Sequence, residues 1–111
     1  MTELTDDTGA PIQVTREGDA FTVQVEGQTV GLARFVDRAD HRVFVHTEVE
    51  PAFGGRGLAT AVIAHALATT RAEGRRIVAL CPMVAAYVKK HHDFDDILDR
   101  PTREIIDSLR G

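Results

Sequence analysis

Hydrophobic and polar residues alternate through the first half of the chain, which is typical of β-strands. Residues 20–26 read AFTVQVE, and this strict alternation predicts a strand with one buried face. Residues 11–16, 29–36 and 42–49 are rich in β-branched and aromatic side chains and predict three more strands. Because only short polar turns separate the four stretches, they are expected to form an antiparallel meander.

The period of the hydrophobic residues changes after residue 57. Residues 58–71 place apolar side chains three and four positions apart, which predicts an amphipathic helix; these side chains are Leu58, Ala59, Val62, Ile63, Ala66 and Leu67. The helix should end near Gly74, and the short apolar stretch 77–81 reads as a buried strand. A strand, a helix and a strand in this order form a crossover unit, so the two strands should be parallel.

The C-terminal third is predicted to be largely helical. Pro82 is at home in the first turn of a helix, which is expected over residues 83–91. Asp93 is expected to cap a brief turn that reaches Leu98, and a last helix should begin at Pro101.

These elements predict an α/β fold. The sheet should be mixed and mostly antiparallel, with one parallel pair and flanking helices. Residues 1–10 are polar and acidic, so they are expected to be a flexible N-terminal tail. Residues 11–111 are expected to form a single domain, because a chain of 111 residues supports one core.

Composition narrows the classes of function. The chain has a net charge of -4, which disfavours nucleic-acid binding because phosphate neutralisation requires a basic face. No apolar run approaches the length of a membrane span, and the polar N-terminus does not resemble a signal peptide. The single cysteine suits a reducing compartment. We therefore expect a cytoplasmic protein that binds neither nucleic acid nor membranes.

Three glycines lie between the fourth predicted strand and the long predicted helix. Gly54, Gly55 and Gly57 lack a Cβ, so backbone N–H groups there can come close to a ligand. The N-terminus of the following helix offers unpaired N–H donors and the positive end of a dipole, which suits phosphate. The alternative is a tight turn whose glycines only supply positive φ. A Walker A loop is excluded because no lysine follows Gly57, and a dinucleotide fingerprint because Thr60 replaces its third glycine.

The only cysteine, Cys81, ends a predicted strand and directly precedes a predicted helix. A thiol at this position feels the positive end of the helix dipole, which favours the reactive thiolate. The alternative is a small buried hydrophobic residue, which is the usual fate of a free cysteine. Position alone leaves both roles open.

Three stretches of the sequence carry a family resemblance. They read HTEV over residues 46–49, GGRGLA over 54–59 and CPMVAAYVKKH over 81–91, and Asp93 and Phe94 follow. Together they resemble the GCN5-related N-acetyltransferase superfamily, and within it a group of very small members with an active-site cysteine. The resemblance covers nearly the whole chain beyond the tail. It implies an enzyme that uses acetyl-CoA as donor and acetylates an amine, either small or on a protein, which the sequence does not identify.

The resemblance also implies that the glycine turn binds the pyrophosphate of coenzyme A. Gly57 and Ala59 fill the last two named places of the family's loop pattern, whereas Gly54 stands where the family usually has Arg or Gln. The backbone of Val49 is expected to pair with the pantetheine arm. The full set of expected coenzyme A contacts is Val49, Gly54, Gly55, Arg56, Gly57, Leu58, Ala59, Thr60 and Tyr87. No metal is expected, because no set of ligands with suitable spacing is evident.

By the same resemblance, Cys81 takes the acetyl group from acetyl-CoA and passes it to the amine. Glu48 and His46 lie two residues apart and point to one face of their predicted strand, so they are the candidate bases. Tyr87 is the candidate proton donor to the leaving thiolate. Two alternatives remain: direct transfer from acetyl-CoA without an acetylated cysteine, and a non-catalytic module that binds coenzyme A or a partner.

Overall fold

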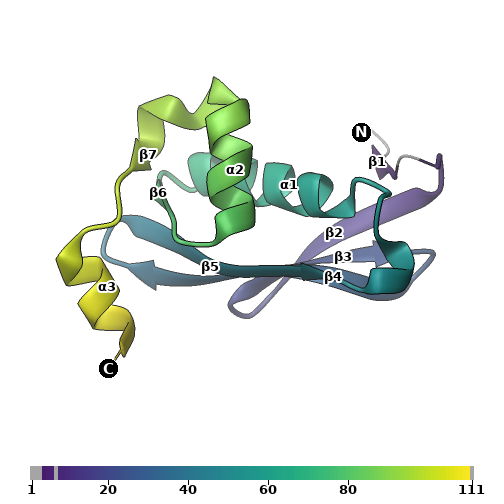
Figure 1. Cartoon of the computed structure of the whole chain (residues 1–111), viewed down its shortest axis with the longest axis horizontal. Coiled ribbons are helices and arrows are strands. Elements are labelled where there is room, and N and C mark those ends of the chain that lie inside the picture. The colour runs from purple at the N-terminus through teal and green to yellow at the C-terminus, as the bar shows by residue number, and fades with distance from the viewer. Residues whose placement is uncertain (1–3, 7, 111) are drawn as a thin grey trace.

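A single mixed sheet organises the computed structural model, which describes residues 4–6 and 8–110. Seven strands follow one another across the sheet in sequence order. Two helices, α1 and α2, cover one face, and α3 projects from one end (Figure 1). The strands are β1 Leu4–Thr5, β2 Pro11–Glu17, β3 Ala20–Val25, β4 Gln28–Arg38, β5 His41–Val49, β6 Arg76–Ala79 and β7 Leu98–Asp99; the helices are η1 Pro51–Phe53, α1 Leu58–Ala72, α2 Pro82–Lys90, η2 His92–Ile97 and α3 Arg103–Arg110.

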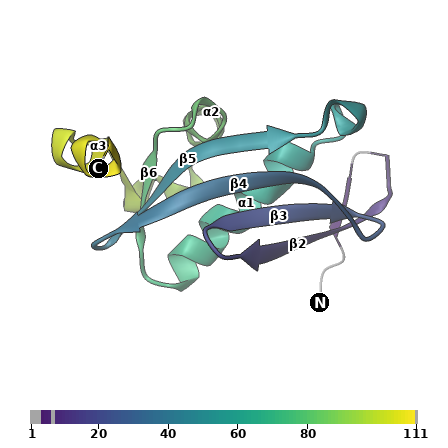
Figure 2. The same ribbon diagram turned by 90° about the horizontal axis from the view of Figure 1, so that it is seen from below.

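The pairing of the strands follows the prediction. From β1 to β5, each strand is antiparallel to the next, as a meander requires. Strands β5 and β6 are parallel, and α1 joins them. Figure 2 shows the long β2, β3, β4 and β5 strands side by side, with α1 packed behind them. The predicted mixed α/β fold with one parallel pair is confirmed, and β7 adds a second parallel partner to β6.

The pairing between strands β5 and β6 ends at Phe44. The last paired residues are Phe44 and Ala79, and β5 then continues to Val49 beyond its last β6 partner. The N–H groups of Leu80 and Cys81 both donate to the Phe44 carbonyl oxygen, at 3.0 and 2.9 Å. The chain therefore leaves the sheet directly after β6, and the prediction of a strand that reaches Cys81 is wrong.

Two short strands are absent from the prediction. Strand β1 pairs with β2 inside the segment expected to be a flexible tail. Strand β7 includes Leu98, which the sequence pattern assigns to a helical turn. That turn is η2, and no side chain caps it, so the capping role expected for Asp93 is wrong. Both strands are two residues long, too short to show a periodic pattern. For residues 1–3 and 7, the tail prediction lies outside the described residues.

The core lies between the sheet and the two helices above it. Helix α1 buries one face, as its four-residue spacing predicts; the buried residues are Leu58, Val62, Ile63, Ala66, Leu67 and Thr70. Each fully buried aliphatic side chain contributes about 1.5 to 3 kcal/mol, so α1 is firmly held. Within the part of the chain described, no helix is both long enough and apolar enough to cross a bilayer.

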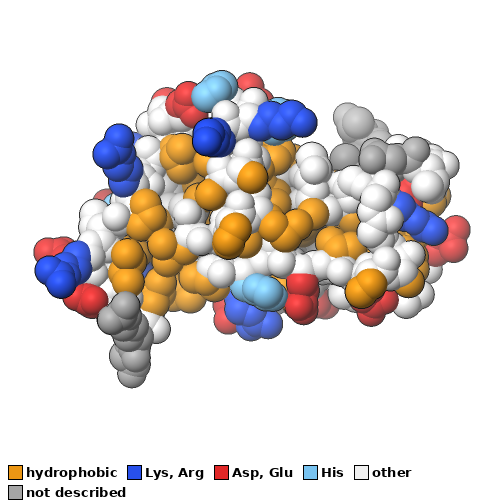
Figure 3. Space-filling model, in the orientation of Figure 1, with side chains coloured by type: hydrophobic (Ala, Val, Ile, Leu, Met, Phe, Trp, Pro, Cys, Tyr) orange, Lys and Arg blue, Asp and Glu red, His pale blue; other side chains and the backbone are white. Residues whose placement is uncertain are grey.

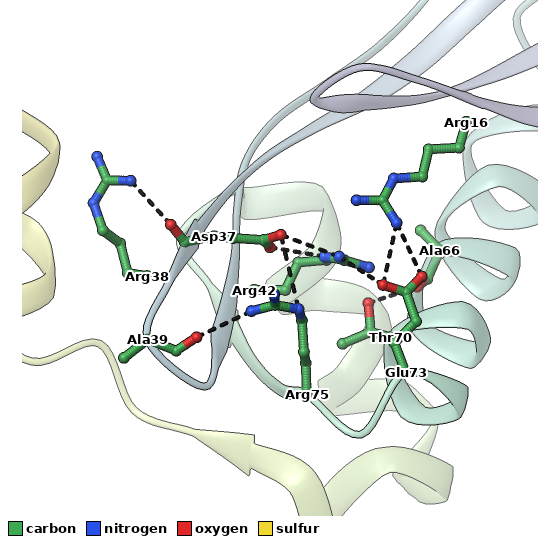
Figure 4. A network of polar contacts seen from close by, with 9 residues as sticks. All are labelled: Arg16, Asp37, Arg38, Ala39, Arg42, Ala66, Thr70, Glu73 and Arg75. Atoms are coloured by element: carbon green, nitrogen blue, oxygen red, sulfur yellow. Dashed lines mark hydrogen bonds and ion pairs between the residues drawn. The ribbon is translucent and has the colours of Figure 1, made fainter.

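A buried arginine ties the far end of α1 to the sheet (Figure 4). The side chain of Arg42 has no exposed surface, and its guanidinium lies 4.5 Å from the centre of the Phe35 ring. Arg42 Nε donates to Asp37 at 2.9 Å, and Nη2 donates to Glu73 at 3.0 Å. Glu73 also accepts two hydrogen bonds from Arg16. The hydrogen bonds from Arg42 are the largest cause of the lowered pKa of both Asp37 and Glu73.

Candidate active site

The glycine turn leads directly into α1. Gly55 and Gly57 have φ of 77° and 75°, in the left-handed region that favours glycine. Gly57 is the N-cap of α1, no side chain caps the helix, and its first turn contains no acidic residue. The first N–H groups of α1 are therefore free of side-chain competition for an anion, and the helix dipole adds positive potential there.

An open pocket of about 360 Å³ lies against this turn. It is lined by Glu48 and Val49 at the end of β5, by Phe53, and by Met83 of α2. The rest of its lining comes from the turn and the start of α1, namely Gly54, Gly55, Gly57, Leu58, Ala59 and Thr60. The structure thus brings together all the expected coenzyme A contacts except Arg56 and Tyr87.

Tyr87 lines a second pocket, of about 290 Å³, between α1 and α2. The two pockets share Ala59, Thr60 and Met83, so they adjoin. The Tyr87 ring lies 4.5 Å from the ring of His91, measured between centroids. Burial raises the pKa of Tyr87, and Asp93 adds to the shift, so the phenol keeps its proton and can donate a hydrogen bond.

Positive charge accompanies the second pocket. Lys90, in the last turn of α2, lines it. Figure 3 shows Lys and Arg side chains around the upper part of α2, above a band of hydrophobic side chains. An apolar groove with a positive end and a free helix N-terminus suits a ligand with an apolar arm and phosphates.

Arg56 lines neither pocket. Its guanidinium lies 4.9 Å from the centre of the Phe53 ring, and its Nη1 lies 3.5 Å from Oδ2 of Asp6. Asp6 is buried and accepts hydrogen bonds from the hydroxyl and the N–H of Thr8, and the bond from the hydroxyl is the largest cause of its lowered pKa. The side chain of Arg56 is therefore drawn toward β1 by a carboxylate that the sequence pattern assigns to a tail.

Cys81 is the N-cap of α2, but its thiol does not cap the helix; it is hydrogen-bonded to the Thr47 side chain of β5. The residue is 3% exposed, and its Sγ lies 3.3 Å from Oγ1 of Thr47, which is 6% exposed. Cys81 lines neither of the two pockets. The burial of the thiol supports a packing role, and its position at a helix N-terminus supports a reactive role. It lies beside the part of β5 that extends past the last β6 partner.

Two further residues, Thr47 and Met83, lie at the site although the sequence motifs assign them no role. Thr47 lies between the two candidate bases, and strand alternation turns it to the opposite, buried face. Met83 lines both pockets and is 42% exposed. Its position four residues before Tyr87 puts the two side chains on one face of α2, and this spacing is the signal that could have identified it.

His46 and Glu48 do lie together, as expected. His46 Nε2 is 3.2 Å from Oε2 of Glu48, and their side chains are 57% and 64% exposed. They lie on the face of β5 opposite to Thr47. The candidate bases therefore lie on one side of β5, and the Cys81 thiol lies on the other side, against Thr47.

In the stretches 4–6 and 8–110, no group of three or more His, Cys, Asp or Glu side chains is arranged to hold a metal ion. The ring of His91 packs at a tilt of 33° against the ring of Tyr87. The ring of its neighbour His92 is bonded elsewhere, with Nδ1 2.9 Å from Asp95.

Known proteins share this architecture. The chain is similar to a GCN5-like putative N-acetyltransferase from Staphylococcus aureus, with 17% identity, a TM-score of 0.62 and coverage of 82% of this chain and 91% of that one. It is also similar to an N-acetyltransferase from Staphylococcus aureus Mu50, with 22% identity, a TM-score of 0.51 and coverage of 79% and 53%. For the ribosomal-protein-S18-alanine N-acetyltransferase from Escherichia coli, the identity is 17%, the TM-score 0.51 and the coverage 56% and 42%. None of the curated protein sequences matches the chain.

These likenesses, at such low identity, show the fold. The sequence itself shows the family, because the family described as GCN5-related N-acetyl-transferase matches residues 20–97, well over half of the chain. The chain therefore belongs to the GCN5-related N-acetyltransferase family, which confirms the superfamily and the class of enzyme that the sequence motifs predict.

Proposed function

We propose that this enzyme transfers the acetyl group of acetyl-CoA to an amine through an acetylated Cys81, as in the small cysteine-containing members of its superfamily. The observation that supports the acetyl-CoA site in this proposal is the pocket at the N-terminus of α1. It joins a glycine turn with positive φ to the end of β5, which pairs with β4 but extends past its last partner on β6. Backbone N–H groups at such a helix start suit the pyrophosphate of coenzyme A.

The residues around the pocket supply further contacts. Val49, at the end of β5, would pair its backbone with the pantetheine arm as an added strand does. Tyr87 keeps its phenolic proton because burial raises its pKa, so it can donate to the departing coenzyme A thiolate. Arg56 contributes at most through its backbone, since its side chain lies on Phe53.

The covalent route has two balanced steps. Cys81 loses its proton, its sulfur bonds to the thioester carbon, the bond from that carbon to the coenzyme A sulfur breaks, and coenzyme A leaves as a thiol with one proton. The neutral amine then attacks acetyl-Cys81, forming an amide and restoring the Cys81 thiol. Glu48 or His46 would take the proton that the ammonium form of the acceptor must lose.

Direct transfer is the second candidate, and one observation favours it. The side chains of Glu48 and His46 are more than half exposed, and Glu48 lines the glycine pocket, whereas Cys81 is almost fully buried. In this mechanism Glu48 or His46 activates the amine for attack on acetyl-CoA, and Cys81 only packs.

Intact-mass analysis separates the two routes. Incubation of the protein with acetyl-CoA should add one acetyl group, and peptide mapping should place it on Cys81. The Cys81→Ala variant should bind coenzyme A normally, because the phosphate contacts lie on another element, but should form no adduct and acetylate no amine. Two-substrate kinetics of the wild type, over a panel of primary amines, should follow a ping-pong pattern. Transfer by Cys81→Ala at the wild-type rate would establish direct transfer instead.

A further inference from the structure

We propose that Thr47 is a positioning residue that holds the Cys81 sulfur and stabilises its thiolate; this inference rests on the covalent route proposed above. Thr47 Oγ1 lies 3.3 Å from Cys81 Sγ, and both residues are nearly fully buried. The contact lies just beyond the last paired residues of β5 and β6. At this point α2 begins, with Cys81 as its N-cap next to β5.

The backbone around the contact is fixed on both sides. Thr47 pairs with Ala33 of β4 in the sheet. The N–H groups of Leu80 and Cys81 donate to the Phe44 carbonyl, three residues before Thr47 on the same strand. The distance between the hydroxyl and the sulfur is therefore set by main-chain hydrogen bonds and does not depend on a mobile loop.

A hydroxyl suits this position because it can reverse its role. In the resting enzyme the thiol donates its hydrogen to Thr47 Oγ1. When the sulfur loses its proton, the hydroxyl can rotate and donate to the thiolate, since Ser and Thr hydroxyls are both donors and acceptors. Hydrogen bonds to charged groups are about twice as strong as neutral ones, so the contact gains strength in the reactive state.

Among the side chains that the structure describes, no charged group offers the same help. Within residues 5–6 and 8–109, no Lys, Arg or His group is hydrogen-bonded to Cys81 Sγ. His46 and Glu48, the neighbours of Thr47, point to the opposite face of β5. In the described part of the chain, the Thr47 hydroxyl and the N-terminus of α2 are the two groups placed to stabilise a sulfur anion at this position.

The proposal predicts that the hydroxyl, and not the bulk of Thr47, controls the reactivity of Cys81. Thr47→Val keeps the branched shape and removes the hydroxyl, and Thr47→Ser keeps the hydroxyl and removes the methyl group. At saturating acetyl-CoA, Thr47→Val should acetylate Cys81 roughly ten- to a hundredfold more slowly, the range expected for a lost hydrogen bond to a charged group. Thr47→Ser should stay within about threefold of the wild type. The dissociation constant for coenzyme A should be the same in all three proteins.

Alkylation of Cys81 by iodoacetamide at fixed pH gives a second readout that needs no acetyl transfer. It should slow in Thr47→Val and recover in Thr47→Ser, with Cys81→Ala as the unreactive control. Equal acetylation and alkylation rates in wild type and Thr47→Val would overturn the role of Thr47 and leave the covalent route intact. If Thr47→Val and Thr47→Ser both react slowly, the loss of rate comes from altered packing, and this result would also overturn the role of the Thr47 hydroxyl. Absence of any acetyl adduct in the wild type would instead refute the covalent route, while alkylation still tests the contact with Thr47.

Discussion

The N-cap position of α1 offers a direct test of the phosphate site. Gly57 has φ of 75° and precedes a first turn without acidic residues. Gly57→Asp would place a carboxylate beside the N–H groups that we assign to the pyrophosphate. Gly57→Asn is the matched control, because Asn has the same shape, tolerates the same backbone conformation and is an equally good N-cap, but carries no charge.

The expected loss of affinity follows from the charge alone. Positive φ costs a residue with a side chain about 1 to 2 kcal/mol, but this cost is common to both variants and cancels in their comparison. Two unit charges about 4 Å apart repel by about 1 kcal/mol in water and by about 4 kcal/mol near a protein surface. Gly57→Asp should therefore bind coenzyme A roughly five- to a thousandfold more weakly than Gly57→Asn.

Calorimetric titration with coenzyme A measures this difference, and thermal unfolding checks that both variants are folded. Gly57→Asp should be at least as stable as Gly57→Asn, since a carboxylate at a helix N-terminus interacts favourably with the dipole. The gap in affinity should narrow as salt is added. Equal affinity in the two variants, with normal binding by the wild type, would show that the phosphates lie elsewhere.

Two further predictions concern stability. In Gly31→Ala, the new Cβ would lie 2.9 Å from the backbone oxygen of Glu48 and 3.0 Å from the side chain of Val49, so urea unfolding should show a loss of about 1 to 3 kcal/mol; unchanged stability would mean that β4 and β5 can move apart. The hydrogen bond from Arg76 is the main reason that the pKa of Asp99 falls from 3.8 to about 2. A lowered folded pKa means that this stabilisation is complete above pH 4 and is lost as the pH falls toward 2. Asp99→Asn should cost less than about 1 kcal/mol at neutral pH, because the pair is partly exposed, and should flatten the acid limb of a pH series of denaturant titrations.

The repeated patterns of the sequence were sufficient to predict most of the fold. The four-residue spacing from Leu58 to Ala66 predicts α1, which runs over Leu58–Ala72. Strand alternation predicts which side of β5 carries His46 and Glu48. These patterns are informative because they extend over several turns or several pairs of residues.

What the sequence could not supply depends on contacts between distant segments. Arg56 belongs to the glycine turn in sequence, yet its side chain faces Asp6 because β1 brings that carboxylate to it. The position of Cys81 outside the pockets follows from the early end of β6 and the hydrogen bond to Thr47. The local sequence around Arg56 does not indicate Asp6 as its partner, and the local sequence around Cys81 does not indicate Thr47.

The buried Arg42 also has a consequence for how the chain folds. One of its carboxylate partners, Asp37, lies 5 residues away on the same hairpin, and the other, Glu73, lies 31 residues away after α1. An intermediate that buried the β4–β5 hairpin before α1 docked would hold a desolvated guanidinium with only half of its counter-charges, which is strongly unfavourable. The arginine thus penalises partly assembled states and couples closure of the hairpin to docking of α1 in a single cooperative step.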